Sequence, residues 1–151
     1  MNKPKAKGTA AETAVVRWFR EHGFPHSDRQ PLRGNRDAGD IALTAGVVLE
    51  VKAHRTAAAG QPGPMQLAEW MAQAALERYN AGAAHCPLIV KRAGTADVGR
   101  WFAYLPLAEL VVLTGGPDTT RTAPVCLTVA ALATLLRDAG YGATINFEES
   151  A

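Results

Sequence analysis

Two charged residues, Glu50 and Lys52, lie in an otherwise apolar segment that reads Val-Val-Leu-Glu-Val-Lys over residues 47–52. In an extended strand alternate residues share a face, about 6.5–7 Å apart, so both side chains are expected on the same face. Burying charged groups costs several kcal/mol unless they are paired or bind a metal ion. The spacing therefore predicts that Glu50 and Lys52 belong to one polar site.

A second carboxylate, Asp40, begins the preceding apolar segment, and the turn signal Ala45-Gly46 predicts a hairpin that sets Asp40 beside Glu50. Proteins usually hold Mg²⁺ with one or two carboxylates and water, and a substrate phosphate completes the shell. An adjacent ammonium group can orient or deprotonate a water and offset charge in a phosphoryl transition state. The alternative interpretation is a half-exposed hairpin whose Glu and Lys face water.

A helix over residues 9–22 is expected to bring a third carboxylate. Thr9 to Glu12 has the pattern of a capping box, and Gly23 is a helix stop. Glu12 shares one face of this helix with apolar residues, namely Val15, Val16 and Phe19. Glu12 can therefore point toward the cluster of Asp40, Glu50 and Lys52 rather than toward solvent.

The remaining pattern predicts three extended segments (26–33, 39–44 and 47–54), a helix over 64–80, strands over 86–90 and 100–105, a short helix over 107–113 and a helix over 128–139. The helix over 64–80 is expected to have an apolar side, formed by Met65, Ala68, Met71, Ala72, Ala75, Leu76 and Tyr79. This order predicts an α/β fold with a mixed β-sheet flanked by helices.

Composition limits the alternatives. The chain has 151 residues, 48% of them apolar, which is enough for one domain with a sizeable core. It contains no apolar stretch of about 18 residues that could span a bilayer. Its two cysteines lack metal-site spacing, and no Walker A, Rossmann or HExxH motif is present. We therefore expect a cytoplasmic protein. Arg outnumbers Lys eleven to five, as in proteins of high-GC genomes, so we expect a bacterial or phage-infected host cell.

The charge is unevenly distributed. Residues 1–36 contain eight Lys or Arg and three Asp or Glu, for a net charge of +5, and the remaining residues have eight and eleven, for −3. A basic N-terminal region favours a polyanionic partner such as nucleic acid, and a solvated basic surface is the alternative. The candidate DNA-binding residues are Lys3, Lys5, Lys7, Arg29, Arg33, Arg36, His54 and Arg55.

These motifs together resemble a known nuclease family. Gly39-Asp40-Ile41 followed by Glu50-Val51-Lys52 looks like the PD-(D/E)xK nuclease signature, with Gly39 where that pattern usually has proline. Lys7-Gly8-Thr9-Ala10-Ala11-Glu12 resembles the KGxxxE opening of archaeal-type Holliday junction resolvases within this superfamily. The segment 29–34 lies where those resolvases carry an Arg-x-Pro-x-Ser-Gly sequence, with arginine replacing the serine.

The resemblance covers about residues 5–113 and implies a restriction-endonuclease-like core over residues 1–113. Residues 114–151 lie outside the resemblance, and we expect them to form a C-terminal helical extension of the same domain. The resemblance also implies a Mg²⁺-dependent endodeoxyribonuclease, able to use Mn²⁺, that acts as a homodimer on four-way junctions in DNA recombination and repair. Asp40, Glu50 and the backbone carbonyl of Val51 would bind the metal, and Lys52 and Glu12 would complete the catalytic set. Gln66 resembles an accessory glutamine of some relatives.

Two alternatives remain open at this stage. One is another PD-(D/E)xK nuclease, either restriction-like or an exonuclease. The other is a non-catalytic DNA-binding module on the same scaffold. The presence of Asp40, Glu50 and Lys52 together disfavours the second, because two carboxylates near DNA repel phosphate unless a metal ion is bound.

Overall fold

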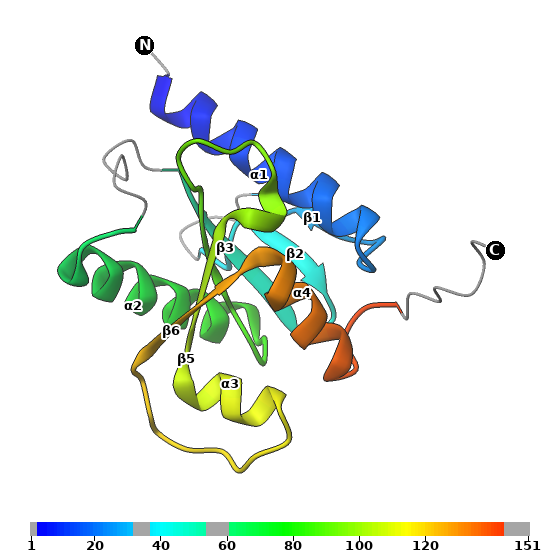
Figure 1. Cartoon of the computed structure of the whole chain (residues 1–151), viewed down its shortest axis with the longest axis vertical. Helices are drawn as coiled ribbons and strands as arrows, with labels where there is room; N and C mark the ends of the chain where they lie inside the picture. The colour runs from blue at the N-terminus through cyan, green and yellow to red at the C-terminus, as the bar shows by residue number, and fades with distance from the viewer. Residues whose placement is uncertain (1–2, 32–36, 54–60, 144–151) are drawn as a thin grey trace.

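A six-stranded mixed β-sheet forms the centre of the molecule (Figure 1). The computed structural model describes residues 3–31, 37–53 and 61–143. The sheet order follows the chain, and among these described residues only β3 and β4 pair as parallel strands. The strands are β1 (Asp28–Arg29), β2 (Ile41–Thr44), β3 (Val47–Lys52), β4 (Leu88–Val90), β5 (Phe102–Pro106) and β6 (Pro124–Thr128).

In the described part of the chain four α-helices flank this sheet, which confirms the expected α/β class (Figure 1). They are α1 (Lys3–Glu21), α2 (Pro64–Ala81), α3 (Leu107–Leu113) and α4 (Val129–Asp138). The main apolar core joins one face of the sheet to α1 and α4, whereas α2 packs on the opposite face. Among the described residues, no helix is both long and apolar enough to cross a membrane.

The alternation of side chains along β3 positions the predicted polar site. Leu49 and Val51 belong to the core cluster under α1 and α4, whereas Val48 packs with Ala74 of α2. Glu50 follows the same alternation as Val48, so it projects toward α2. The prediction that Glu50 and Lys52 share one face is confirmed, and that face is the one that α2 covers.

The hairpin that carries this site is also confirmed. β2 and β3 pair antiparallel, with Thr44 opposite Val47 and Ile41 opposite Leu49. Gly46 in the connecting turn has φ +85°, a left-handed conformation that glycine adopts readily. The tight turn fixes the register between β2 and β3. It therefore also determines which residues of β3 lie beside Asp40, which directly precedes β2.

The predicted start of the first helix is wrong. Helix α1 begins at Lys3, so Thr9 lies inside the helix, where its carbonyl accepts a hydrogen bond from the Thr13 hydroxyl. The predicted end is confirmed, because Gly23 has φ +96° and the Phe24 N–H donates to the Phe19 carbonyl. The helix packs on the sheet through the face that the sequence indicated, because Val15, Val16 and Phe19 are buried.

The apolar side of α2 is largely exposed. Met65 is 89% exposed, Tyr79 is 83% exposed and Leu76 is 61% exposed. The helix instead buries Trp70, Ala74 and Glu77. The parallel connection from β3 to β4 fixes how α2 lies over the sheet, and the face it turns inward carries polar side chains that meet Glu50 and Lys52.

The sequence predicted that the region after residue 113 is helical, but its described part also contains a strand. Strand β6 pairs with β5 and extends the sheet, with Ala103 opposite Leu127. Thr128 then caps α4 by accepting a hydrogen bond from the Ala131 N–H. Leu132 and Leu136 of α4 are fully buried in the main core, so the described part of this region is built into the domain.

Candidate active site

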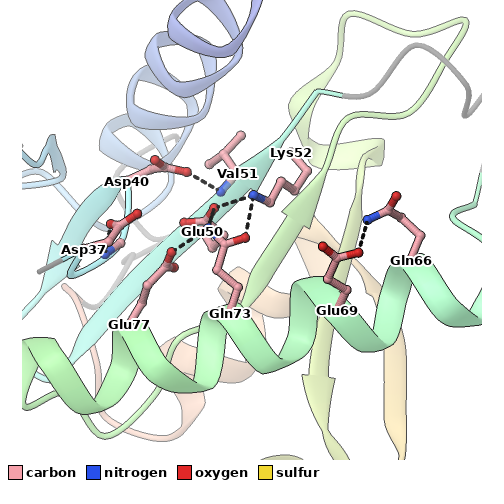
Figure 2. A network of polar contacts seen from close by, with 10 residues as sticks. Asp37, Asp40, Glu50, Val51, Lys52, Gln66, Glu69, Gln73 and Glu77 are labelled. Atoms are coloured by element: carbon pink, nitrogen blue, oxygen red, sulfur yellow. Dashed lines mark hydrogen bonds and ion pairs between the residues drawn. The ribbon is translucent and has the colours of Figure 1, made fainter. Parts of the chain in front are cut away.

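Backbone hydrogen bonds hold Asp40 against β3. Its N–H donates to the Leu49 carbonyl at 2.9 Å, and its Oδ2 accepts from the Val51 N–H at 2.8 Å (Figure 2). The Asp40 side chain therefore lies beside β3, the strand that carries Glu50 and Lys52. The hairpin brings together the three residues predicted to form the site.

Gly39, just before Asp40, explains one departure from the nuclease signature. Its φ is +94°, a value that proline cannot adopt because its ring fixes φ near −65°. A Cβ at this position would lie 3.2 Å from the Leu49 carbonyl oxygen. The backbone that directs Asp40 toward β3 thus requires glycine here.

We expect Gly39→Ala to destabilise the protein by about 1–2 kcal/mol, because an L-residue is strained in the left-handed region. Urea unfolding followed by circular dichroism measures this loss. Gly94 is a matched control, because its φ is +83° but no atom lies within 4 Å of an added Cβ. Gly39→Ala should therefore be the more harmful change, and equal losses at both positions would show that the contact with Leu49 is unimportant.

The Glu50 and Lys52 side chains form an ion pair, with Lys52 Nζ 3.0 Å from Glu50 Oε1 (Figure 2). The Glu50 side chain is only 4% exposed, whereas that of Lys52 is 23% exposed. The pair is therefore open to solvent on the lysine side. A substrate group could reach Lys52 without disrupting the buried carboxylate.

Two residues of α2 that the sequence analysis missed complete this network. The side-chain Oε1 of Gln73 accepts from Lys52 Nζ at 2.8 Å, and Gln73 Nε2 donates to Glu50 Oε1 at 3.2 Å and to Glu77 Oε1 at 2.9 Å. Figure 2 shows Gln73 and Glu77 pointing from α2 toward Glu50. Their four-residue spacing was the available signal, because it places two polar side chains on one helix face.

Burial and mutual repulsion change how the carboxyl groups ionise. Burial and the repulsion of the Glu50 carboxylate together raise the pKa of Asp40 to about 7, against the opposing effect of the Val51 N–H. Burial also raises the pKa of Glu50 to about 8, together with its contact to Glu77 and despite the favourable Lys52 charge. The pKa of Glu77 is raised as well, mainly by burial. A nearby cation would stabilise the ionised form of such carboxyl groups.

These shifts predict that the metal-free protein loses stability as the pH rises. In the unfolded chain both carboxyl groups ionise near pH 4, whereas in the folded protein the pKa values of Asp40 and Glu50 are about 7 and about 8. Their contribution is fully present below about pH 4 and is lost progressively as the pH rises from there through 7–8. Urea unfolding across this range in EDTA measures the slope.

The double variant Asp40→Asn/Glu50→Gln should flatten this profile, because neither replacement ionises. Glu69→Gln serves as its control, since Glu69 is an exposed acid of α2 that contacts Gln66 rather than the cluster. An equally steep profile in the double variant would contradict the assignment of these two groups.

Glu12 lies near the cluster and is engaged in a separate ion pair. Its Oε2 contacts Arg29 Nη2 at 2.8 Å and Nε at 2.9 Å, and the carboxylate contributes to raising the pKa of Asp40. Arg29, a predicted DNA-binding residue, therefore neutralises the predicted fourth catalytic residue. Its side chain remains 43% exposed, so it is still accessible to a polyanion.

The other predicted residues have different positions. Gln66 donates to Glu69 at 3.4 Å and lies about two helical turns before Gln73, which makes the contacts with the cluster (Figure 2). Lys3, Lys5 and Lys7 are in α1. Four other predicted DNA-binding residues lie outside the described residues: Arg33, Arg36, His54 and Arg55.

The donor set fits a hard divalent cation that shares its shell with other ligands. No group of three or more His, Cys, Asp or Glu in the described part of the chain is arranged to hold a metal ion. However, Glu50 Oε2 and Glu77 Oε2 are buried oxygens that receive no hydrogen bond from the described residues. Carboxylate oxygens are the ligands that Mg²⁺ prefers, with water and phosphate completing its octahedral shell.

Comparison with models of known families, with curated proteins and with solved structures finds no match to this chain. The functional interpretation therefore depends on the residues of the site and on the sequence motifs.

Proposed function

We propose that this protein is a divalent-metal-dependent endonuclease that cuts branched DNA. The observation that carries the proposal is the arrangement of Asp40, Glu50 and Lys52 on one hairpin: two carboxyl groups with raised pKa values stand beside an ammonium group that is partly open to solvent. This is the combination that metal-assisted hydrolysis of a phosphodiester requires.

Each residue of the cluster has a distinct task in this proposal. Asp40 and Glu50 would hold the cation, which supplies charge for the phosphoryl group and lowers the pKa of a water when bound. Lys52 would donate a hydrogen bond to the attacked phosphate or orient the water. Gln73 keeps the Lys52 ammonium and the Glu50 carboxylate in fixed positions through its amide, so it acts as a positioning residue.

The resemblance to archaeal-type Holliday junction resolvases supports a four-way junction as the substrate and a restriction-endonuclease-like fold as the scaffold. The order of site elements agrees with this proposal: a helix carrying Glu12, then the hairpin carrying Asp40, Glu50 and Lys52. The basic N-terminal third, with its net charge of +5, supports a polyanionic partner.

Incubation with end-labelled four-way junction, duplex, single strand and flap tests the substrate class. We expect paired, symmetric nicks on the junction in Mg²⁺ and little cleavage of the other three. Equal cutting of duplex would favour a restriction-like nuclease, cutting inward from ends would favour an exonuclease, and tight binding without any cutting would favour a non-catalytic DNA-binding module.

Two symmetric nicks need two active sites related by a dyad, so we propose a two-fold homodimer. The exposed apolar face of α2 supports this proposal. If two copies of α2 pair antiparallel around Ala72, Met65 of one helix lies opposite Tyr79 of the other, and Ala68 lies opposite Leu76. The face is thus self-complementary, with large side chains opposite each other at the ends and a small residue at the centre.

We expect Leu76→Glu to convert the dimer into a monomer, because it places a charge within this apolar face, opposite Ala68 of the other copy. Light scattering at the concentrations used for cleavage measures the mass. Ala130→Glu is the control, since Ala130 is an exposed residue of another helix, α4. A dimer that persists in Leu76→Glu would show that α2 does not form the interface.

A further inference from the structure

A second basic segment, far along the chain from the N-terminal region, follows β4. Residues 91–100 contain Lys91, Arg92 and Arg100 and a single acid, Asp97. Among the described residues, none of these three basic side chains forms an ion pair with a carboxylate. The segment can therefore bind an anionic partner without breaking an ion pair in the described part of the chain.

Strand pairing places this segment beside the candidate active site. Because β3 and β4 are parallel, they end at the same edge of the sheet, where Lys52 lies opposite Val90. Val90 in turn lies opposite Phe102 of β5. Lys52, Val90 and Phe102 thus form a row across three strands, and neighbouring strands are about 4.8 Å apart. Across this row, the backbone of Phe102 is about 10 Å from that of Lys52.

Two aromatic rings show on which face of the sheet each basic side chain lies. Phe102 packs against the apolar cluster between the sheet and α2, and Arg92 Cζ lies over its ring, 5.3 Å from the centroid. The preceding residue, Lys91, lies instead over Trp101, a member of the core under α1 and α4. Arg92, rather than Lys91, therefore shares with Lys52 the face of the sheet that α2 covers.

The contact with Phe102 prepares Arg92 to bind a phosphate. A guanidinium that lies over an aromatic ring keeps its N–H groups in its own plane, where two of them can donate to one phosphate. A side chain that is already restrained by such a contact loses less conformational freedom when it binds. Both Arg92 and Phe102 are partly exposed, so a ligand can reach them from solvent.

We propose that Arg92, positioned by Phe102, binds a backbone phosphate of the bound DNA about three nucleotides from the phosphate that is attacked. Phosphates of one strand are about 3.4 Å apart along the helix axis, so the row of about 10 Å spans about three nucleotides. Phosphate contacts carry no base information, so Arg92 sets the position and affinity of the DNA rather than its sequence. The inference rests on the proposed function, because the distance is counted from Lys52.

Junction binding by Arg92→Ala tests this inference, measured by fluorescence anisotropy in EDTA over a series of salt concentrations. We expect about tenfold weaker binding, as for the loss of a charged hydrogen bond, and a salt dependence less steep by about 0.9 for each lost contact. Lys91→Ala removes the neighbouring charge on the opposite face, so it should have the smaller effect on both quantities. Equal effects of the two variants, or an unchanged salt dependence in Arg92→Ala, would overturn the inference.

A second variant tests the ring and keeps the experiment decisive if Arg92→Ala fails to fold, as judged by circular dichroism. Phe102→Leu keeps an apolar side chain in the cluster below α2 but removes the ring that positions Arg92. We expect it to weaken junction binding without changing the net charge. Wild-type affinity in Phe102→Leu would overturn the positioning by Phe102.

Cleavage of the same junction in Mg²⁺ separates this inference from the proposed function. A chain that cuts the junction, but whose binding does not depend on Arg92, refutes the phosphate contact alone. A chain that binds the junction through Arg92 but never cuts it supports the phosphate contact and refutes the proposed nuclease.

Discussion

Replacing Lys52 with alanine should reduce DNA cleavage by about 10²–10⁴-fold, the range by which a positioned proton donor or acceptor accelerates a reaction. The Lys52 ammonium is 3.0 Å from Glu50 Oε1 and 2.8 Å from Gln73 Oε1, and its side chain is 23% exposed, so it can reach a bound phosphate. Its interaction with the substrate is expected to matter most in the transition state. Single-turnover cleavage of a labelled junction measures the rate.

The matched control for this change is Lys91→Ala. Lys91 follows β4 and its N–H donates to the Lys52 carbonyl, but its ammonium lies over the Trp101 ring rather than in the polar cluster. Both variants lose one lysine from neighbouring positions, so metal-free junction binding should weaken only modestly in each. If Lys52→Ala remains folded and cuts at nearly the wild-type rate, Lys52 is not part of an active site.

Asp40→Asn and Glu50→Gln should each reduce cleavage by at least about 10³-fold, as expected when a site loses a group that stabilises transition-state charge. Each replacement keeps the shape of the side chain and removes a charge that a cation needs. Metal-free DNA binding should stay the same or become tighter, because the phosphate no longer faces an uncompensated carboxylate. Fluorescence anisotropy in EDTA measures the binding.

Both variants should also be at least as stable as the wild type without metal, because each removes a buried carboxyl group whose pKa is raised by burial and by its neighbours. Glu69→Gln, an exposed acid of α2, should leave cleavage, binding and stability within a small range of the wild type. A loss of cleavage together with a loss of stability and DNA binding would indicate unfolding rather than a defect in catalysis.

The sequence predicted the strand hairpin and the meeting of Asp40, Glu50 and Lys52, because these features depend on local rules. Alternation along β3 determines which residues share a face, and the turn at Gly46 determines the register. It did not predict Gln73 and Glu77. Apolar periodicity assumes that a helix buries its most apolar face, and α2 buries polar residues because it covers a polar site.

Two other features could not be derived locally. The ion pair between Glu12 and Arg29 joins α1 to β1 across the fold, so no short-range pattern specified it. Strand β6 alternates between exposed and half-buried residues, and it is held as a strand by pairing with β5 rather than by a strong apolar pattern of its own. In both cases the deciding contact lies far away in the sequence.

The central claim is that this cluster of carboxylates and lysine hydrolyses DNA with a divalent cation. The most direct measurement follows cleavage of one labelled four-way junction by the purified chain in Mg²⁺, in excess EDTA, and after Mg²⁺ or Mn²⁺ is restored. We predict paired nicks in Mg²⁺, none in EDTA and recovery with either metal, since oxygen ligands accept both. Robust cleavage in excess EDTA, or none with either metal, would contradict the account.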